Sequence, residues 1–185
     1  MQSKGASVSG RGLEMSIVSA YATGIVRTSY LIALGSNKRH ARYGPPERVL
    51  AAALDQLDIS VVALSRIVQS APVGPSNRRY ANAAAMIETP MTPPELLHHL
   101  KTIEDRFGRR AGGRRWGARV LDLDIILWSG GLWATPSLAI PHPAFRDRGF
   151  VLSPAIDIAP DWRDPVTGLT LRHLKARLDR RCPRP

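Results

Sequence analysis

The chain has 185 residues, of which 44% are hydrophobic and 22% are charged. These proportions are typical of one folded globular domain rather than of a disordered or membrane protein. The formal net charge of +11 predicts affinity for an anion, such as nucleic acid, acidic lipid or a polyphosphate, although an arginine-rich coding bias explains it equally well. The single cysteine, Cys182, excludes an internal disulfide and a cysteine-ligated metal, and it indicates a reducing, cytoplasmic compartment.

The two ends of the chain differ from its middle in composition. Residues 1–29 mix Ser, Gly, Thr and Arg and have no continuous apolar centre of the kind that a secretory signal needs. We expect a disordered leader, with translation starting at Met15 as one explanation; a targeting segment is the alternative. Residues 30–178 then form a single domain, and residues 179–185 form a basic tail.

The first half of this domain alternates between strand and helix patterns. A short buried strand is predicted at Tyr30–Leu34, ended by the Gly-Ser-Asn sequence that follows it. A helix that opens at Pro45-Pro46 is predicted next. Its apolar residues recur on one face: Val49, Leu50, Ala53, Leu54 and Leu57. Residues 60–68 and 82–89 are predicted to be strands, and residues 71–77 have the composition of a loop.

The second predicted helix has the clearest limits. Thr92 is a natural N-cap, Pro93 takes the first helical position, and Glu95 completes a capping box. The helix is predicted to end at Gly108, after a buried stripe of Leu96, Leu97, Leu100, Ile103 and Phe107. A loop rich in arginine and glycine follows at residues 109–118, and then a strand at residues 119–128. From Ser129 onwards, prolines indicate irregular chain as far as a short helix at residues 169–178.

The order β-α-β-β-α-β predicts an α+β fold of ferredoxin-like type, in which two helices pack on one face of an antiparallel sheet and a C-terminal extension follows.

The last predicted strand of this core contains two aspartates, Asp122 and Asp124. Side chains alternate along a strand, so both carboxylates point to one face, and Leu121, Leu123, Ile125 and Leu127 point to the other. Two carboxylates about 7 Å apart repel each other unless a cation lies beside them. Mg²⁺ binds such carboxylates together with substrate phosphates. The alternative is that both aspartates are simply solvated.

Arginines surround this pair in the sequence. Arg109 and Arg119 flank the glycine-containing loop, and Arg148 follows further along. A guanidinium group donates paired hydrogen bonds to a phosphate, so the metal and the arginines together predict a nucleotide-phosphate site. The sequence has no Walker A pattern. A solvated basic loop remains the alternative for Arg110 and Arg114.

At this point the sequence resembles a known family. The run Arg115-Trp-Gly-Ala-Arg-Val-Leu-Asp-Leu-Asp124 is similar to the signature of the 6-hydroxymethyl-7,8-dihydropterin pyrophosphokinase family of folate biosynthesis. Three other stretches also resemble this family: Leu34-Gly-Ser-Asn37, Tyr80-Ala-Asn82, and Ile140-Pro-His-Pro143 through Arg148-Gly-Phe150 to Ile158-Ala-Pro160. Ala118 departs from the family pattern, which has proline there, and Ala111 stands where some members have arginine.

The resemblance implies a transferase that moves pyrophosphate from ATP to the hydroxymethyl group of the dihydropterin and releases AMP. It implies two Mg²⁺ ions on Asp122 and Asp124, with Arg109 and Arg119 as further catalytic residues. The residues that it assigns to the nucleotide are Glu104, Arg109, Trp116, Arg119, His142 and Arg148. The residues that it assigns to the pterin are Ser70, Val73, Tyr80, Asn82, Trp116 and Phe150. We expect a monomer that acts on small molecules, with no nucleic-acid or membrane partner.

Two other classes of function compete with this one. An RNA-binding module is compatible with a basic ferredoxin-like domain, but the sequence has no aromatic-rich RNP1-like strand. A metal-dependent nuclease also uses paired aspartates, yet it leaves Tyr80, Asn82 and Phe150 without a role. Considered without the family, the aromatic residues Tyr80 and Phe150 are more typical of a hydrophobic core.

Overall fold

The computed structural model describes residues 27–71, 79–108 and 120–181. Its centre is a five-stranded sheet with the order β2-β4-β1-β5, in which β3 also pairs with β4. All pairings are antiparallel. The strands are β1 (Thr28–Ser36), β2 (Ser60–Leu64), β3 (Val68–Ser70), β4 (Tyr80–Thr89) and β5 (Asp122–Trp128). This arrangement confirms the predicted ferredoxin-like sheet.

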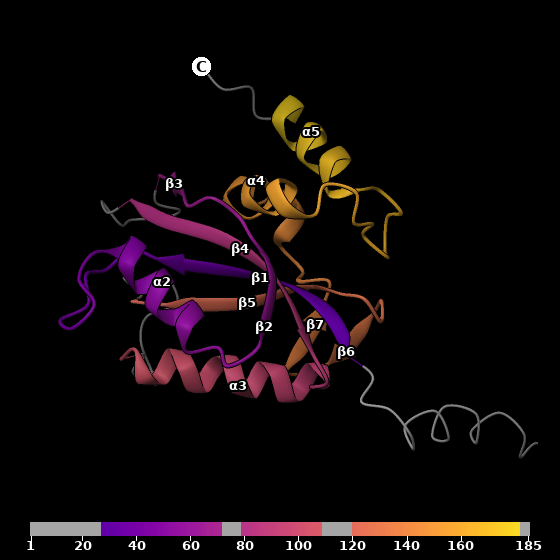
Figure 1. The fold of residues 1–185 in the computed structure, drawn as a ribbon. Helices are drawn as coiled ribbons and strands as arrows, with labels where there is room; N and C mark the ends of the chain where they lie inside the picture. The colour runs from indigo at the N-terminus through magenta and orange to yellow at the C-terminus, as the bar shows by residue number, and fades with distance from the viewer. Residues whose placement is uncertain (1–26, 72–78, 109–119, 182–185) are drawn as a thin grey trace, which may run out of the picture.

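Helices cover both faces of the sheet, as Figure 1 shows. On one face lie α2 (Pro46–Asp55) and α3 (Pro93–Arg106), which are the two predicted helices. Their side chains form one hydrophobic core with inward residues of the sheet, such as Ile32, Leu34 and Leu123. On the other face lie α4 (Gly149–Ile158) and α5 (Leu171–Arg181), which form a second core with Leu31 and Leu127.

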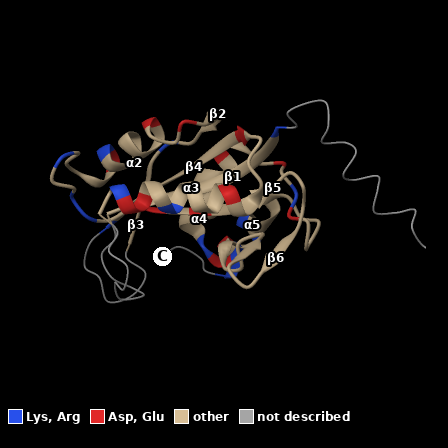
Figure 2. Cartoon of the chain, turned by 90° about the horizontal axis from the view of Figure 1, so that it is seen from below, with Lys and Arg blue, Asp and Glu red and all other residues tan. Residues whose placement is uncertain are grey.

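Helix α3 confirms the limits that the sequence predicts. The Glu95 carboxylate accepts hydrogen bonds from the backbone N–H and the hydroxyl of Thr92, each at 2.7 Å, which completes the capping box. Gly108 follows the helix with φ of +86°, a conformation that favours glycine. Charged residues of both signs lie along the helices in the view of Figure 2.

Several predicted limits are wrong. Strand β1 continues through Gly35 and Ser36 instead of ending before them. The predicted strand 60–68 is divided into β2 and β3 by Ser65, Arg66 and Ile67. Strand β5 begins only at Asp122. Helix α5 extends to Arg181, so three residues of the expected basic tail are helical.

The C-terminal region is more regular than its prolines suggested. Strands β6 (Trp133–Thr135) and β7 (Leu138–Ile140) pair as a hairpin, and the 3-10 helix η2 (Phe145–Asp147) leads into α4. Helix α4 contains Pro154, which is buried. A proline inside a helix removes one backbone hydrogen bond, but the apolar face of α4, including Leu152 and Ala155, packs against the sheet.

A β-bulge in β5 overturns one prediction about side-chain direction. Leu31 pairs with Leu127 and Ile32 pairs with Ile125, so Ile126 is an extra residue in β5. An extra residue reverses the alternation of side chains beyond it. Leu127 therefore packs in the core beneath α4 and α5 and not on the face of Leu123.

None of the helices in the described parts of the chain combines the length and the apolar character that a membrane crossing requires.

Candidate functional site

Three neighbouring strands place Asn82, Gly35 and Asp122 in one row across the sheet. Gly35 of the central strand pairs with Asn82 on one side and with Asp122 on the other. A Cβ atom at Gly35 would lie 3.7 Å from Asn82 Oδ1 and 4.0 Å from Asp122 Cβ. The glycine thus leaves open the space between the predicted pterin residue and the predicted metal ligand. This role of Gly35 is not predicted by the sequence, although Gly35 stands in one of the stretches that resemble the family.

The two aspartates lie on the same face of the sheet, as predicted. Between them, Leu123 belongs to the core beneath α2 and α3, so Asp122 and Asp124 face the side of α4 and α5. Both are half-buried, and the Asp124 side chain is 31% exposed. Both carboxylates are therefore close to the solvent at the start of β5.

His142 lies beside the aspartates. Its Nε2 atom is 4.0 Å from Asp124 Oδ2, and its Nδ1 atom accepts a hydrogen bond from the backbone N–H of Ala144 at 3.2 Å. The neutral ring consequently carries its proton on Nε2, towards the aspartate. Burial lowers the pKa of His142; Asp124 acts against this effect, and Arg148 adds to it. The structure therefore brings His142, Arg148 and the aspartates together.

Arg148 and Phe150 stand at the start of α4. Arg148 is the N-cap residue of this helix, and its Cζ atom lies 5.8 Å from the centre of the Phe150 ring. Phe150 is half-buried and packs against the second core. The preceding turn is anchored by Arg146, which donates two hydrogen bonds, of 2.8 and 2.7 Å, to the buried carboxylate of Asp164.

Ser70, Tyr80 and Asn82 meet where β3 pairs with β4. Ser70 is the partner of Tyr80 in this ladder. The Asn82 amide donates to Ser70 Oγ at 3.0 Å and to the Tyr80 carbonyl at 3.4 Å. These two bonds use the Nδ2 group, and the Oδ1 atom is left on the side of Gly35. An amide held in this way can bind the edge of a flat heterocycle.

Glu104 occupies a different position from the other predicted residues. Its side chain is fully buried on α3, and its Oε1 atom accepts a hydrogen bond of 2.7 Å from the backbone N–H of Leu123. It therefore supports β5 from the face opposite to the aspartates. Four further predicted residues lie outside the described parts of the chain: Val73, Arg109, Trp116 and Arg119.

The described residues fit a metal that is held partly by substrate. Within the described ranges, no group of three or more His, Cys, Asp or Glu side chains is arranged to hold a metal ion. The pair Asp122 and Asp124 supplies carboxylate oxygens on one half-exposed face. Mg²⁺ typically accepts one or two carboxylates and completes its octahedron with water and phosphate oxygens. The donor set thus suits Mg²⁺ bound together with a polyphosphate.

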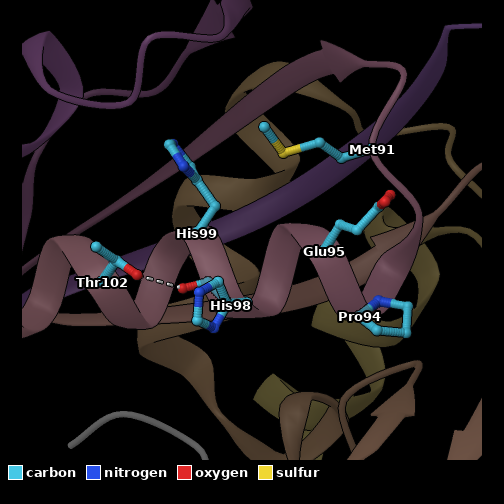
Figure 3. Close-up of a pocket in the computed structure, with 6 residues that line it drawn as sticks. All are labelled: Met91, Pro94, Glu95, His98, His99 and Thr102. Carbon is cyan, nitrogen blue, oxygen red and sulfur yellow. Dashed lines mark hydrogen bonds between the residues drawn. The ribbon is translucent and has the colours of Figure 1, made fainter.

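Two hollows in the described surface are lined by none of the predicted site residues. One, of about 550 Å³, lies along α3 and is lined by Met91, Pro94, Glu95, His98, His99 and Thr102 (Figure 3). Two of its polar side chains have local partners: Glu95 caps the helix, and His99 Nε2 lies 2.6 Å from the Leu57 carbonyl. The other, of about 620 Å³, is lined by residues such as Asp55, Asp58 and Glu88.

Comparison with known sequences gives a consistent result. The family model described as 7,8-dihydro-6-hydroxymethylpterin-pyrophosphokinase matches residues 31–160. A Synechocystis protein named 2-amino-4-hydroxy-6-hydroxymethyldihydropteridine pyrophosphokinase is 37% identical over 153 residues, which are 80% of this chain and 75% of that protein. Proteins of the same name from Pseudomonas aeruginosa and Haemophilus influenzae are 40% and 42% identical, and each match covers 72% of this chain and 82% of the relative.

Comparison with solved structures supports the fold. The crystal structure of Plasmodium falciparum HPPK-DHPS with STZ-DHP superposes with a TM-score of 0.63 at 13% identity, over 84% of this chain and 42% of that one. The A437G variant with SDX-DHP gives a TM-score of 0.67 at 15% identity, over 86% and 47%. The chain thus spans less than half of these two structures and shares the fold of that part.

Proposed function

The chain belongs to the 7,8-dihydro-6-hydroxymethylpterin pyrophosphokinase family, and from this we propose how its residues divide the work of the reaction. The protein transfers pyrophosphate from ATP to 6-hydroxymethyl-7,8-dihydropterin in folate biosynthesis. In this reaction the acceptor hydroxyl oxygen loses its proton to solvent and bonds to the β-phosphorus of ATP, the bond from that phosphorus to the α-phosphate oxygen breaks, and AMP leaves with that oxygen.

Asp122 and Asp124 are the metal ligands of this proposal. Two Mg²⁺ ions bound with ATP would neutralise the charge that the phosphate oxygens gain during transfer. The position of both carboxylates on one half-exposed face supports this assignment. Through these ions, the aspartates would keep the polyphosphate on that face of the sheet.

The pterin is bound by residues on the other side of Gly35. Asn82 recognises the edge of the ring, and Ser70 orients its amide through the 3.0 Å hydrogen bond. Tyr80 and Phe150 stack on the faces of the ring, and Val73 and Trp116 complete this set. The row formed by Asn82, Gly35 and Asp122 supports the proposal, because the residue assigned to the pterin and a residue assigned to the metal flank the same glycine.

The nucleotide is bound by cationic and imidazole groups near the aspartates. Neutral His142 offers its Nε2–H to a phosphate or ribose oxygen, and Arg148 offers its guanidinium to the phosphates. Arg109 and Arg119 assist the transfer, and Trp116 helps to exclude water from the site. Glu104 stands at the margin of this set, beneath β5.

The remaining assignments concern the whole protein. The catalytic domain of the proposal is the one expected at residues 30–178; in the structure, β1 begins at Thr28 and α5 ends at Arg181. The protein is a cytoplasmic monomer, a proposal that rests on its single cysteine, on ATP as the co-substrate and on the family resemblance.

The observation that carries the proposal is the shared row of Asn82 and Asp122 around Gly35. The test is an assay of AMP release from ATP and Mg²⁺, with and without 6-hydroxymethyl-7,8-dihydropterin. AMP should form only when the pterin is present, and in equal amount to the pterin diphosphate. Release of ADP, or AMP formation without pterin, would contradict the proposal. RNA and DNA should neither replace the pterin nor be cleaved.

A further inference from the structure

Helix α3 provides hydrogen-bond partners for the backbone of β5, the strand at the edge of the described sheet. Strand β5 pairs with β1 on one side and is the last strand in the order β2-β4-β1-β5. The outward backbone groups of an edge strand need partners other than a neighbouring strand. For Leu123, both partners come from α3: its N–H donates to Glu104 Oε1 at 2.7 Å, and its carbonyl accepts from Lys101 Nζ at 3.3 Å.

Lys101 and Glu104 also bind each other. The Lys101 Nζ atom lies 2.9 Å from Glu104 Oε1 in an ion pair between residues one helical turn apart. The three interactions form a closed ring of Lys101, Glu104 and the Leu123 backbone. The Glu104 side chain is fully buried, and that of Lys101 is 36% exposed. A buried carboxylate that shares a cation and a backbone N–H is held firmly in place.

The position of Leu123 gives this ring its significance. Leu123 stands between Asp122 and Asp124, and its two backbone groups belong to the peptide units that join it to those aspartates. Fixing both groups restricts the rotation of these units, and hence the directions of the neighbouring Cα–Cβ bonds. The ring therefore acts on the two carboxylates from the opposite face of the sheet.

We propose that Lys101 is a positioning residue for the pyrophosphoryl transfer. Together with Glu104, it holds the Leu123 backbone so that the carboxylates of Asp122 and Asp124 face one metal–polyphosphate group. This inference rests on the proposed role of the aspartates as metal ligands. Lys101 acts through the backbone of β5, and this action requires no contact with either substrate.

The test compares metal affinity in variants of the full chain. Lys101→Met keeps the aliphatic stem and removes the donor. The affinity of this variant for Mn²⁺ should fall about threefold to tenfold. It is measured by electron paramagnetic resonance in the presence of an ATP analogue with a methylene bridge between the α- and β-phosphates. The Mg²⁺ concentration that gives half-maximal turnover should rise by a similar factor. Pterin affinity, measured alone by calorimetry, should not change.

Lys175 provides a matched control. It is also a largely buried helical lysine, with a side chain 10% exposed, and it forms an ion pair with Asp179 of α5. Lys175→Met should lower the thermal midpoint and leave the Mn²⁺ affinity unchanged, because the ion-pair partner Asp179 belongs to α5 and not to β5. Lys101→Arg, which restores a cationic donor, should recover most of the metal affinity.

Three outcomes would overturn the inference. The first is a folded Lys101→Met variant with the Mn²⁺ affinity of the unmodified protein. The second is an equal loss of Mn²⁺ affinity in the Lys175→Met control, which would indicate general destabilisation. The third is an Arg variant that recovers nothing. If Lys101→Met does not fold, Lys101→Gln gives the same comparison. Absence of pterin-dependent AMP release from the unmodified protein would instead contradict the proposed function, whatever the metal affinities.

Discussion

The backbone N–H of His142 donates a hydrogen bond of 3.0 Å to the carbonyl of Ile126, the extra residue in the bulge of β5. A bulged residue interrupts the ladder with the neighbouring strand, and here its carbonyl binds the segment that follows β7. This main-chain hydrogen bond holds the His142 backbone beside β5, and the His142 ring then lies 4.0 Å from Asp124. The bulge therefore places His142 in the candidate site.

Replacing His142 with alanine tests this arrangement. The backbone contact to Ile126 should persist, so the thermal midpoint should change little. The nucleotide should lose one hydrogen-bond donor, so the binding free energy of a non-reactive ATP analogue should weaken by about 1 kcal/mol, which raises its dissociation constant roughly fivefold. Calorimetry with the pterin alone serves as the control and should show no change. Unchanged nucleotide affinity together with a large fall in stability would indicate a purely structural histidine.

Replacing either aspartate tests the metal assignment. Asp122→Asn and Asp124→Asn should each lower kcat by about 1,000-fold or more, because the transition-state charge loses its metal clamp. Each variant should remain folded, since the substitution removes one charge from a repelling pair. The measurement is AMP release at saturating Mg²⁺, with circular dichroism as the folding control. A variant that keeps more than about a tenth of the activity would refute this role.

Gly35 allows a graded test of the space between the two halves of the site. An alanine Cβ would lie 3.7 Å from Asn82 Oδ1, which is an ordinary contact, so Gly35→Ala should fold and keep substantial activity. The larger Gly35→Val should fill the space and raise the KM for the pterin more than tenfold, about 1.4 kcal/mol or more. Steady-state kinetics of both variants provide the check. Equal kinetics of the valine variant and the unmodified protein would show that the substrates do not use this space.

The aromatic residues can be tested by separating the two substrates. Tyr80→Ala and Phe150→Ala should each weaken pterin binding by about 1–3 kcal/mol, through lost burial and stacking of the ring. Binding of the ATP analogue without pterin should stay nearly constant. Calorimetry on each ligand gives both values. If Phe150→Ala weakens both ligands equally and lowers the thermal midpoint, then Phe150 acts as a core residue.

Asp164 offers a test of stability against pH. Burial acts to raise the pKa of Asp164, but hydrogen bonds from Arg146, Thr167 and the Val166 backbone outweigh it and hold the pKa below its ordinary value. A carboxylate whose pKa is lower in the folded state stabilises the fold above its unfolded pKa of about 3.9. This contribution disappears as the pH falls through the lower, folded value.

Asp164→Asn should therefore reduce the free energy of unfolding by about 3 kcal/mol at pH 7, and the loss should shrink as the pH falls below about 3.9. Urea unfolding at several pH values measures both effects. Asp161→Asn is the matched control: Asp161 pairs with Arg172, and the two side chains are 78% and 63% exposed. Its loss should be about 0.5 kcal/mol or less. A constant difference between the Asp164 variant and the unmodified protein across the pH range would argue against the linkage.

Much of the fold follows from local patterns in the sequence. The capping box at Thr92 and Glu95 and the apolar stripe of α3 are local, so the sequence predicts this helix to within two residues. The shared face of Asp122 and Asp124 follows from strand alternation alone. The pairing of Asp122 with Gly35 could not be predicted in the same way, because strand register depends on contacts distant in sequence.

The errors also have physical causes. Pro154 suggested irregular chain, yet Val151, Leu152 and Ala155 have helical spacing and lie buried in α4. Their burial against the sheet outweighs the missing hydrogen bond of the proline. The bulge at Ile126 has no local marker, because the run Ile125-Ile126-Leu127 is apolar whichever side chain faces each core. The ring of Lys101, Glu104 and Leu123 likewise depends on how α3 docks against β5.

The row of Asn82, Gly35 and Asp122 also sets the distance between the residues at its two ends. Each member belongs to a different strand, and antiparallel neighbours are separated by about 4.8 Å. The Cα atoms of Asn82 and Asp122 are therefore separated by two strand spacings, or about 10 Å. Backbone hydrogen bonds between the strands maintain each of these spacings. Side-chain substitution changes the chemical groups at the two ends of the row, but the backbone pairing of the three strands keeps the distance between those ends constant.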